Sequence, residues 1–170
     1  EIADLPHTEK IAHLQQPEFR ARILAERQED HLMRTRVTQW DRIFPLGDPP
    51  DYEPAADKSV AARAAREGRS AEEVGYDLLL ENDGKTILYR PLSNYAYGDL
   101  ETVSDMMQHP NSLIGLGDGG AHVGVLTDAS AFTYMLTHWT RDRVRGEKLS
   151  LPWAIKRLSH DNAAAIGLND

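Results

Sequence analysis

The spacing of apolar residues along the chain predicts mostly helices. Two helical pieces are expected in residues 8 to 32, meeting at Pro17, because proline lacks the amide hydrogen that a continuous helix needs. Further helices are predicted at residues 59 to 67, 70 to 84, 98 to 110, 128 to 146 and 149 to 167. Ser70 and Glu73 have the spacing of a capping box, and Ser150 precedes a proline as an N-cap residue does.

Short apolar runs between these helices predict strands. Residues 36 to 46 are a strand candidate and residues 86 to 93 a buried strand, whereas the three prolines in residues 47 to 57 predict an internal Pro-rich loop. The run at 112 to 118 is continuously apolar, which is typical of parallel strands covered on both faces. The order strand, helix, strand, helix predicts an α/β fold with right-handed parallel units, and two such units leave a sheet edge open.

Composition narrows the classes of protein. The chain has 170 residues, of which 41% are hydrophobic, and has no apolar run long enough for a membrane span, so we expect one soluble domain with no membrane partner. A net charge of -8 argues against nucleic acid as a partner. The absence of cysteine excludes disulfides and thiolate metal sites and fits a cytoplasmic location. Because the chain starts at Glu1, we expect it to be a piece of a longer protein.

The sequence GLGDGGAH, residues 115 to 122, is the strongest candidate for a functional site. Asp118 ends a predicted buried strand, and working residues of α/β folds gather at the carboxyl ends of parallel strands. The flanking glycines allow a sharp turn and leave room for a ligand or metal beside the carboxylate. From the residues alone, Asp118 is equally well explained as the cap of a turn.

The segments LETVSDMMQHPNSLIGLGDGGAHVG and THWTRDRVRGEKLSLPWAIKRLSHDNAAAIGLND carry a family resemblance. Together they resemble the C-terminal part of metal-dependent amidohydrolases of the N-acyl-D-amino-acid deacylase (D-aminoacylase) type, and the likeness extends upstream over most of the chain. The resemblance implies a TIM barrel that holds one or two divalent metals, usually zinc, and hydrolyses amide-type carbon–nitrogen bonds. It implies that Asp118 is both a metal ligand and the base that accepts a proton from the attacking water.

The chain also departs from that family in two respects. It has no His-x-His pair, and the resemblance places only the last two barrel strands here, near residues 86 to 92 and 112 to 117. One metal ligand cannot assemble a zinc site, so we expect residues 1 to 170 alone to bind metal poorly and to be inactive. Residues 119 to 140 contain no Arg or Lys to hold a substrate carboxylate, which leaves other amide, ester or cyclic-amide substrates open for the parent.

Other residues could line the same pocket as Asp118, although each also has a simpler explanation. His122 could bind substrate or orient Asp118, or it could be a loop histidine. Asn94 and Tyr95 follow the strand at 86 to 93 and would face the pocket of a barrel, although such a pair is common in loops. The arginines and aspartate at the end of the helix 128 to 146 are expected on a solvated face, and these are Arg141, Asp142, Arg143 and Arg145.

Two further interpretations belong to other classes of protein. Gly115, Gly117 and Gly120 fit the pattern G-x-G-x-x-G of nucleotide-binding loops, but Asp118 inside the loop would repel a pyrophosphate. The main alternative to a hydrolase is a non-catalytic binding or assembly domain. Its open sheet would expose apolar surface to water, which favours a homo-oligomer.

Overall fold

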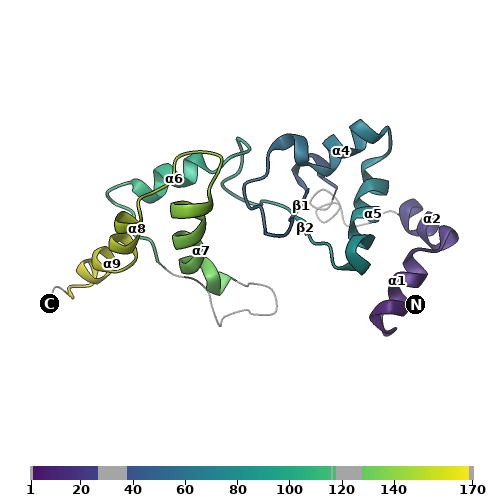
Figure 1. The fold of residues 1–170 in the computed structure, drawn as a ribbon, viewed down its shortest axis with the longest axis horizontal. Helices are drawn as coiled ribbons and strands as arrows, with labels where there is room; N and C mark the ends of the chain where they lie inside the picture. Colours follow the sequence, from purple (N-terminus) through teal and green to yellow (C-terminus); the bar gives the residue numbers. More distant parts are fainter. Residues whose placement is uncertain (1, 27–37, 116, 118–127, 169–170) are drawn as a thin grey trace. The chain divides into compact units, whose positions relative to one another are not determined.

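The structure, a computed structural model, describes residues 2–26, 38–115, 117 and 128–168, and His122 and Asp118 lie outside them. This part of the chain is helix-rich with a two-stranded sheet (Figure 1). The chain divides into unit 1, Glu1–Asp99, and unit 2, Leu100–Asp170. Each unit has a hydrophobic core of its own. Among the described helices, none has the length and apolar character to cross a membrane.

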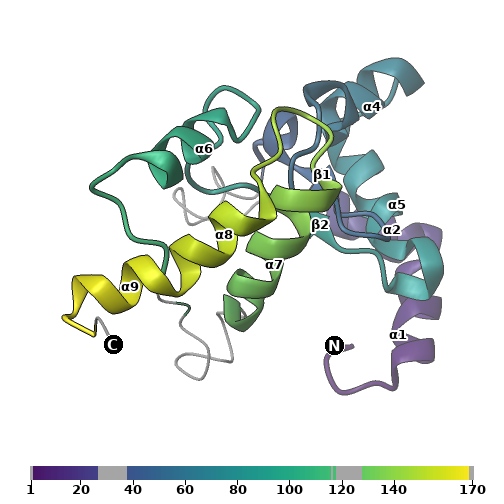
Figure 2. The ribbon, with the colours of Figure 1, turned by 60° about the vertical axis from the view of Figure 1, so that its left-hand side comes forward.

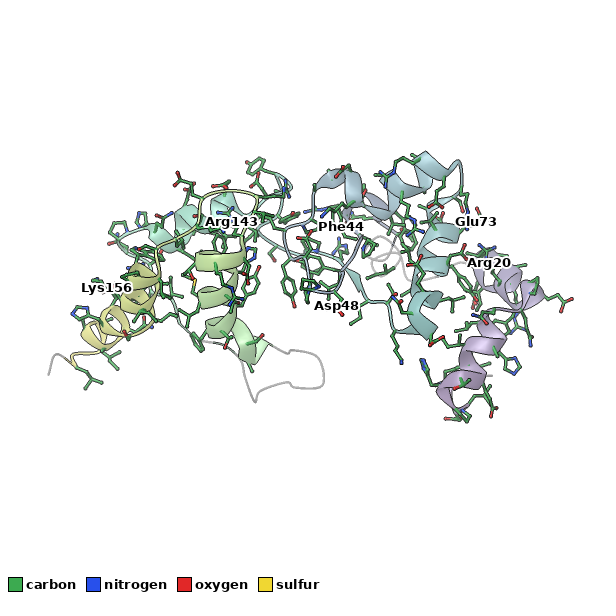
Figure 3. The ribbon with its side chains drawn as sticks, in the orientation of Figure 1. Arg20, Phe44, Asp48, Glu73, Arg143 and Lys156 are labelled. Carbon is green, nitrogen blue, oxygen red and sulfur yellow. The ribbon has the colours of Figure 1, made fainter. Side chains whose placement is uncertain are left out.

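Unit 1 contains helices and short 3-10 turns around a pair of two-residue strands. In chain order they are α1 (His7–Leu14), α2 (Pro17–Ala25), η1 (Trp40–Arg42), β1 (Phe44–Pro45), η2 (Ala56–Lys58), α4 (Val60–Glu67), α5 (Ala71–Gly84) and β2 (Leu88–Tyr89). The first two helices meet at Pro17, as predicted. Arg20 of α2 ties that helix to α5 by an ion pair with Asp77 at 3.2 Å and a longer one with Glu73 at 3.9 Å (Figure 3).

Local capping sequences set both ends of α4 and the start of α5, and of these the end of α4 at Gly68 and the capping box of α5 were predicted. The Ser59 hydroxyl accepts a hydrogen bond from the third amide of α4, and α4 ends at Gly68, whose φ of 64° suits glycine. Ser70 and Glu73 form the complete capping box, in which the serine oxygen accepts from the Glu73 amide and the Glu73 carboxylate accepts from the Ser70 amide.

The core of unit 1 lies between α4, α5 and the chain before β1. Its buried side chains are Ile43, Val60, Ala64, Val74 and Leu78. Trp40 packs against this core and crosses α5 closely at Gly75, where a Cβ atom would stand 2.6 Å from the indole ring. A glycine is therefore required at this position of α5 for the tryptophan to reach the core.

The sheet differs from the one that the sequence predicts. Phe44 of β1 pairs with Tyr89 of β2, and the two strands are antiparallel rather than parallel. Within the predicted strand at 86 to 93, only Leu88–Tyr89 is a strand, and described residues 112–115 form no strand at all. The pairing of β1 with β2 was not predicted, because strand partners are set by tertiary contacts, not by the apolar run itself.

Unit 2 is helical in its described part. Its elements are α6 (Glu101–Gln108), η3 (Asp128–Ser130), α7 (Ala131–Thr137), the π-helical turn η4 (His138–Asp142), α8 (Leu151–Leu158) and α9 (His160–Ala165). Helices α7 and α8 lie side by side (Figures 1 and 2). The core between the helices consists of Met135, Trp139, Leu149 and Ala154, with Leu100, Val103 and Met107 packed against it.

The two long helices predicted in unit 2 are each interrupted. The helix expected at 128 to 146 changes to a π-helical turn at His138 and ends at Asp142. The helix expected at 149 to 167 breaks at Ser159, although Ser150 caps its start as predicted by accepting from the Trp153 amide. The Ser159 hydroxyl donates to the Ile155 carbonyl, which also accepts from the Ser159 amide at 3.1 Å.

Arg143 lies in the interior of unit 2, so its assignment to a solvated face is wrong (Figure 3). Its guanidinium is fully buried, 4.7 Å from the centre of the Trp139 ring. It donates to the Glu101 carboxylate at 2.8 Å and to the Glu147 carbonyl at 3.0 Å. The helix ends at Asp142 and the backbone of Arg143 is non-helical, so the continuous helix expected over 128 to 146 gave Arg143 the wrong surroundings.

Candidate functional site

The chain that leads into the glycine-rich tract is held by side chains of α8 and α9. Asp118 and His122, the predicted ligand and its neighbour, lie outside the described residues, whereas residues 107–115 before them are described. This approach segment, residues 107–115, consists of the last two residues of α6 and the turn and irregular backbone after it, where carbonyl groups need partners from elsewhere in the fold.

Arg157 of α8 supplies most of those partners. Its guanidinium donates to three carbonyl groups of the approach segment, those of Met107 (2.9 Å), His109 (3.2 Å) and Ser112. The side chain is only 10% exposed and lies 5.6 Å from the centre of the Trp153 ring. A buried guanidinium that replaces its water shell with three carbonyl groups fixes the course of that backbone.

Asn162 and Asp161 of α9 complete this anchor. The Asn162 amide donates to the Ile114 carbonyl at 2.6 Å, one residue before Gly115. Asp161 accepts from Lys156 and from Arg157, the latter at 3.3 Å, and so holds Arg157 in place. Lys156 above all, with His160 and Arg157 beside it, lowers the pKa of Asp161 to about 2.

The sequence alone indicates no role for Arg157 or Asn162. The spacing of Arg157 and Asp161, four residues apart, is the one available signal, because such a pair lies on a single helix face. The partners of Arg157 are backbone groups 45 to 50 positions away along the chain, and no sequence pattern marks a carbonyl group as the partner of a distant side chain.

Asn94 and Tyr95, the predicted substrate contacts, lie in unit 1 after β2. Asn94 is exposed, with a left-handed backbone at φ 57° that asparagine tolerates in turns. Tyr95 is buried, and its hydroxyl donates to the Pro54 carbonyl at 2.7 Å. That hydrogen bond connects the Pro-rich loop to the chain after β2, so the Tyr95 hydroxyl has a structural role.

A hollow of about 440 Å³ opens beside Tyr95 within unit 1. It is lined by Asp41, Arg42, Phe44, Pro54, Ala56, Tyr95, Ala96, Tyr97 and Gly98. Arg42 donates to the Tyr95 carbonyl at 3.4 Å, so one guanidinium lies against this wall. The volume is in the range of small-molecule sites.

The described residues hold no group of three or more His, Asp or Glu side chains that could bind a metal ion. The residues that could contribute to such a site, Asp118 and His122, are beyond what the structure describes. A metal centre of the kind that the family resemblance implies would therefore need further ligands beside Asp118 that the described residues do not bring together.

No family model, no curated protein and no solved structure matches this chain.

Proposed function

We propose that this chain is the C-terminal part of the TIM barrel of a metal-dependent amidohydrolase that hydrolyses an amide-type carbon–nitrogen bond. The observation that carries the proposal is the tract GLGDGGAH, which sets one carboxylate among glycines between the family-like segments before and after it. In the parent enzyme a bound zinc or other divalent ion would supply an acidified water. Asp118 would accept its proton and pass it to the leaving amine, and His122, four residues later, would contact the substrate.

The anchor on the approach segment supports this role for the tract. A proton-transfer group needs its position held to a fraction of an ångström, and that position depends on the backbone on either side of it. Arg157 and Asn162 hold the backbone from Met107 to Ile114, which ends one residue before the tract begins. Four hydrogen bonds directed at one short irregular segment suit a segment that leads to a working residue.

The test uses the full-length parent loaded with zinc and a panel of N-acyl amino acids, simple amides and cyclic amides. The Asp118→Asn variant should lose hydrolysis by about 100-fold or more, the usual contribution of a general base. The matched control is Asp105→Asn, an exposed aspartate of α6, which should leave the rate unchanged. Full activity in the Asp118→Asn variant would remove this residue from the mechanism and the proposal with it.

A second function, an assembly domain that forms a homo-oligomer, is favoured by apolar side chains exposed on unit 2. Leu151 and Ile155 are one helical turn apart on α8 and are 53% and 47% exposed. Light scattering at micromolar concentrations tests this alternative. A monomer at every concentration would exclude it, and a dimer that Leu151→Glu dissociates would support it.

A further inference from the structure

The hollow in unit 1 combines a guanidinium with aromatic walls. Arg42 lies in η1 directly before the strand β1, and the chain after β2 runs past it at Tyr95 to Gly98. Phe44, labelled in Figure 3, is buried, and Tyr97 on the same hollow is 83% exposed. The hollow thus has one fixed aromatic residue and one aromatic residue at the surface, which can cover a bound molecule.

Arg42 keeps most of its hydrogen-bonding capacity. A guanidinium carries five N–H donors. Within the described residues, Arg42 makes a single hydrogen bond, the 3.4 Å contact with the Tyr95 carbonyl, and no ion pair. Arg143 and Arg157 in unit 2 are different, because each is committed to several partners. A half-buried arginine with open donors on a hollow is a binding group for an anion.

The lining also limits which anion fits. Asp41, beside Arg42 on the same hollow, adds a negative charge that disfavours a dianion such as phosphate and tolerates a singly charged group. A carboxylate has the flat two-oxygen geometry that matches a guanidinium. The neighbouring Phe44, Pro54 and Tyr97 offer apolar and aromatic surface to the rest of the ligand.

We propose that this hollow binds a small aromatic monocarboxylate, with Arg42 paired to the carboxylate and the ring placed against Phe44 and Tyr97. The proposal goes beyond the hydrolase function, because it uses neither Asp118 nor a metal ion. It holds for residues 1 to 170 as they are, whether or not the parent protein is an amidohydrolase.

The test is a titration of the ¹⁵N-labelled chain with benzoate and, separately, with uncharged benzamide, followed by NMR. Benzoate should shift the amide signals of residues 41–44 and 95–98. Benzamide should bind at least about 10-fold more weakly than benzoate. Arg42→Gln should weaken benzoate by about 10- to 100-fold, the range for a hydrogen bond to a charged group. The affinity of Arg42→Lys for benzoate should lie between those of the unchanged chain and of Arg42→Gln, because lysine keeps the charge and loses the bidentate geometry.

The matched control is Arg66→Gln, which removes another arginine of unit 1 that donates to a backbone carbonyl, that of Asp57, away from the hollow. It should bind benzoate as the unchanged chain does. Equal binding of benzoate and benzamide by the unchanged chain would overturn the proposal without any variant. An equal loss in Arg66→Gln and Arg42→Gln would also overturn it, because binding would then follow overall charge.

Discussion

Replacing Arg143 by methionine tests whether a buried cation organises unit 2. Methionine has a similar length and apolar character, so it fills the space while removing the charge and every donor. The change leaves the Glu147 carbonyl without its 3.0 Å donor and the Glu101 carboxylate without its 2.8 Å partner. It also removes the cation that lies 4.7 Å from the centre of the Trp139 ring.

The magnitude follows from these three contacts. Each hydrogen bond from the guanidinium is worth about 1.5–3 kcal/mol, and the contact with the indole adds roughly 1 kcal/mol. Burial of the cation offsets several kcal/mol of this gain, and methionine avoids that cost. Because Glu101 is 53% exposed and regains water when it loses its partner, the net loss should be about 3 kcal/mol in the free energy of unfolding.

Urea denaturation followed by fluorescence measures this loss. In a Trp40→Phe background the remaining indoles, Trp139 and Trp153, both lie in unit 2 and report on it alone. A loss of about 3 kcal/mol lowers the urea midpoint by about 1–3 M. Arg141→Met is the control, since that exposed arginine pairs, among the residues that the structure describes, with its neighbour Asp142, and its loss should leave the midpoint unchanged. Equal midpoints for Arg143→Met and Arg141→Met would refute the structural role of the buried guanidinium.

Three further predictions concern other contacts. Asn162→Ala removes the hydrogen bond to the Ile114 carbonyl and should lower the free energy of unfolding by about 1 kcal/mol. It should also speed amide hydrogen exchange in residues 112–115, and unchanged exchange would show that the anchor is not formed. The pKa of the Asp161 carboxyl is lowered from 3.8 to about 2, so its charged form stabilises unit 2 above pH 4. This stabilisation should disappear as the pH drops toward 2, and Asp161→Asn should show no such loss of stability. Gly75→Ala should destabilise unit 1 by about 1–3 kcal/mol in thermal unfolding, since the added methyl would meet Trp40, and a stabilised variant would contradict this packing.

Sequence patterns predicted the features of the fold that depend on near neighbours. The caps at Ser70 and Ser150 and the end of α4 at Gly68 are all confirmed, because a cap is formed within three or four residues. The strands were poorly predicted. An apolar run shows that a segment is buried, but whether it pairs, and with which strand, depends on residues far away in the chain.

The positions of buried charges could not be predicted from the sequence. Arg143 follows a π-helical turn that no periodicity announces, and its neighbours Arg141 and Asp142 remain exposed as expected. Arg157 was not recognised because its partners are main-chain carbonyl groups. Among the candidate site residues, Tyr95 follows a strand as expected, but neither the hollow beside it nor the bond from its hydroxyl to the Pro-rich loop could be predicted.

The anchor on residues 107–115 has a consequence for biosynthesis. Its donors, Arg157 and Asn162, are translated some 45 to 50 codons after the carbonyl groups that they hold. A nascent chain can therefore form α6 early, but the backbone that follows α6 stays unanchored until the last two helices have left the ribosome. A translation product that terminates before residue 157 would keep the glycine-rich tract and lose the contacts that hold its approach.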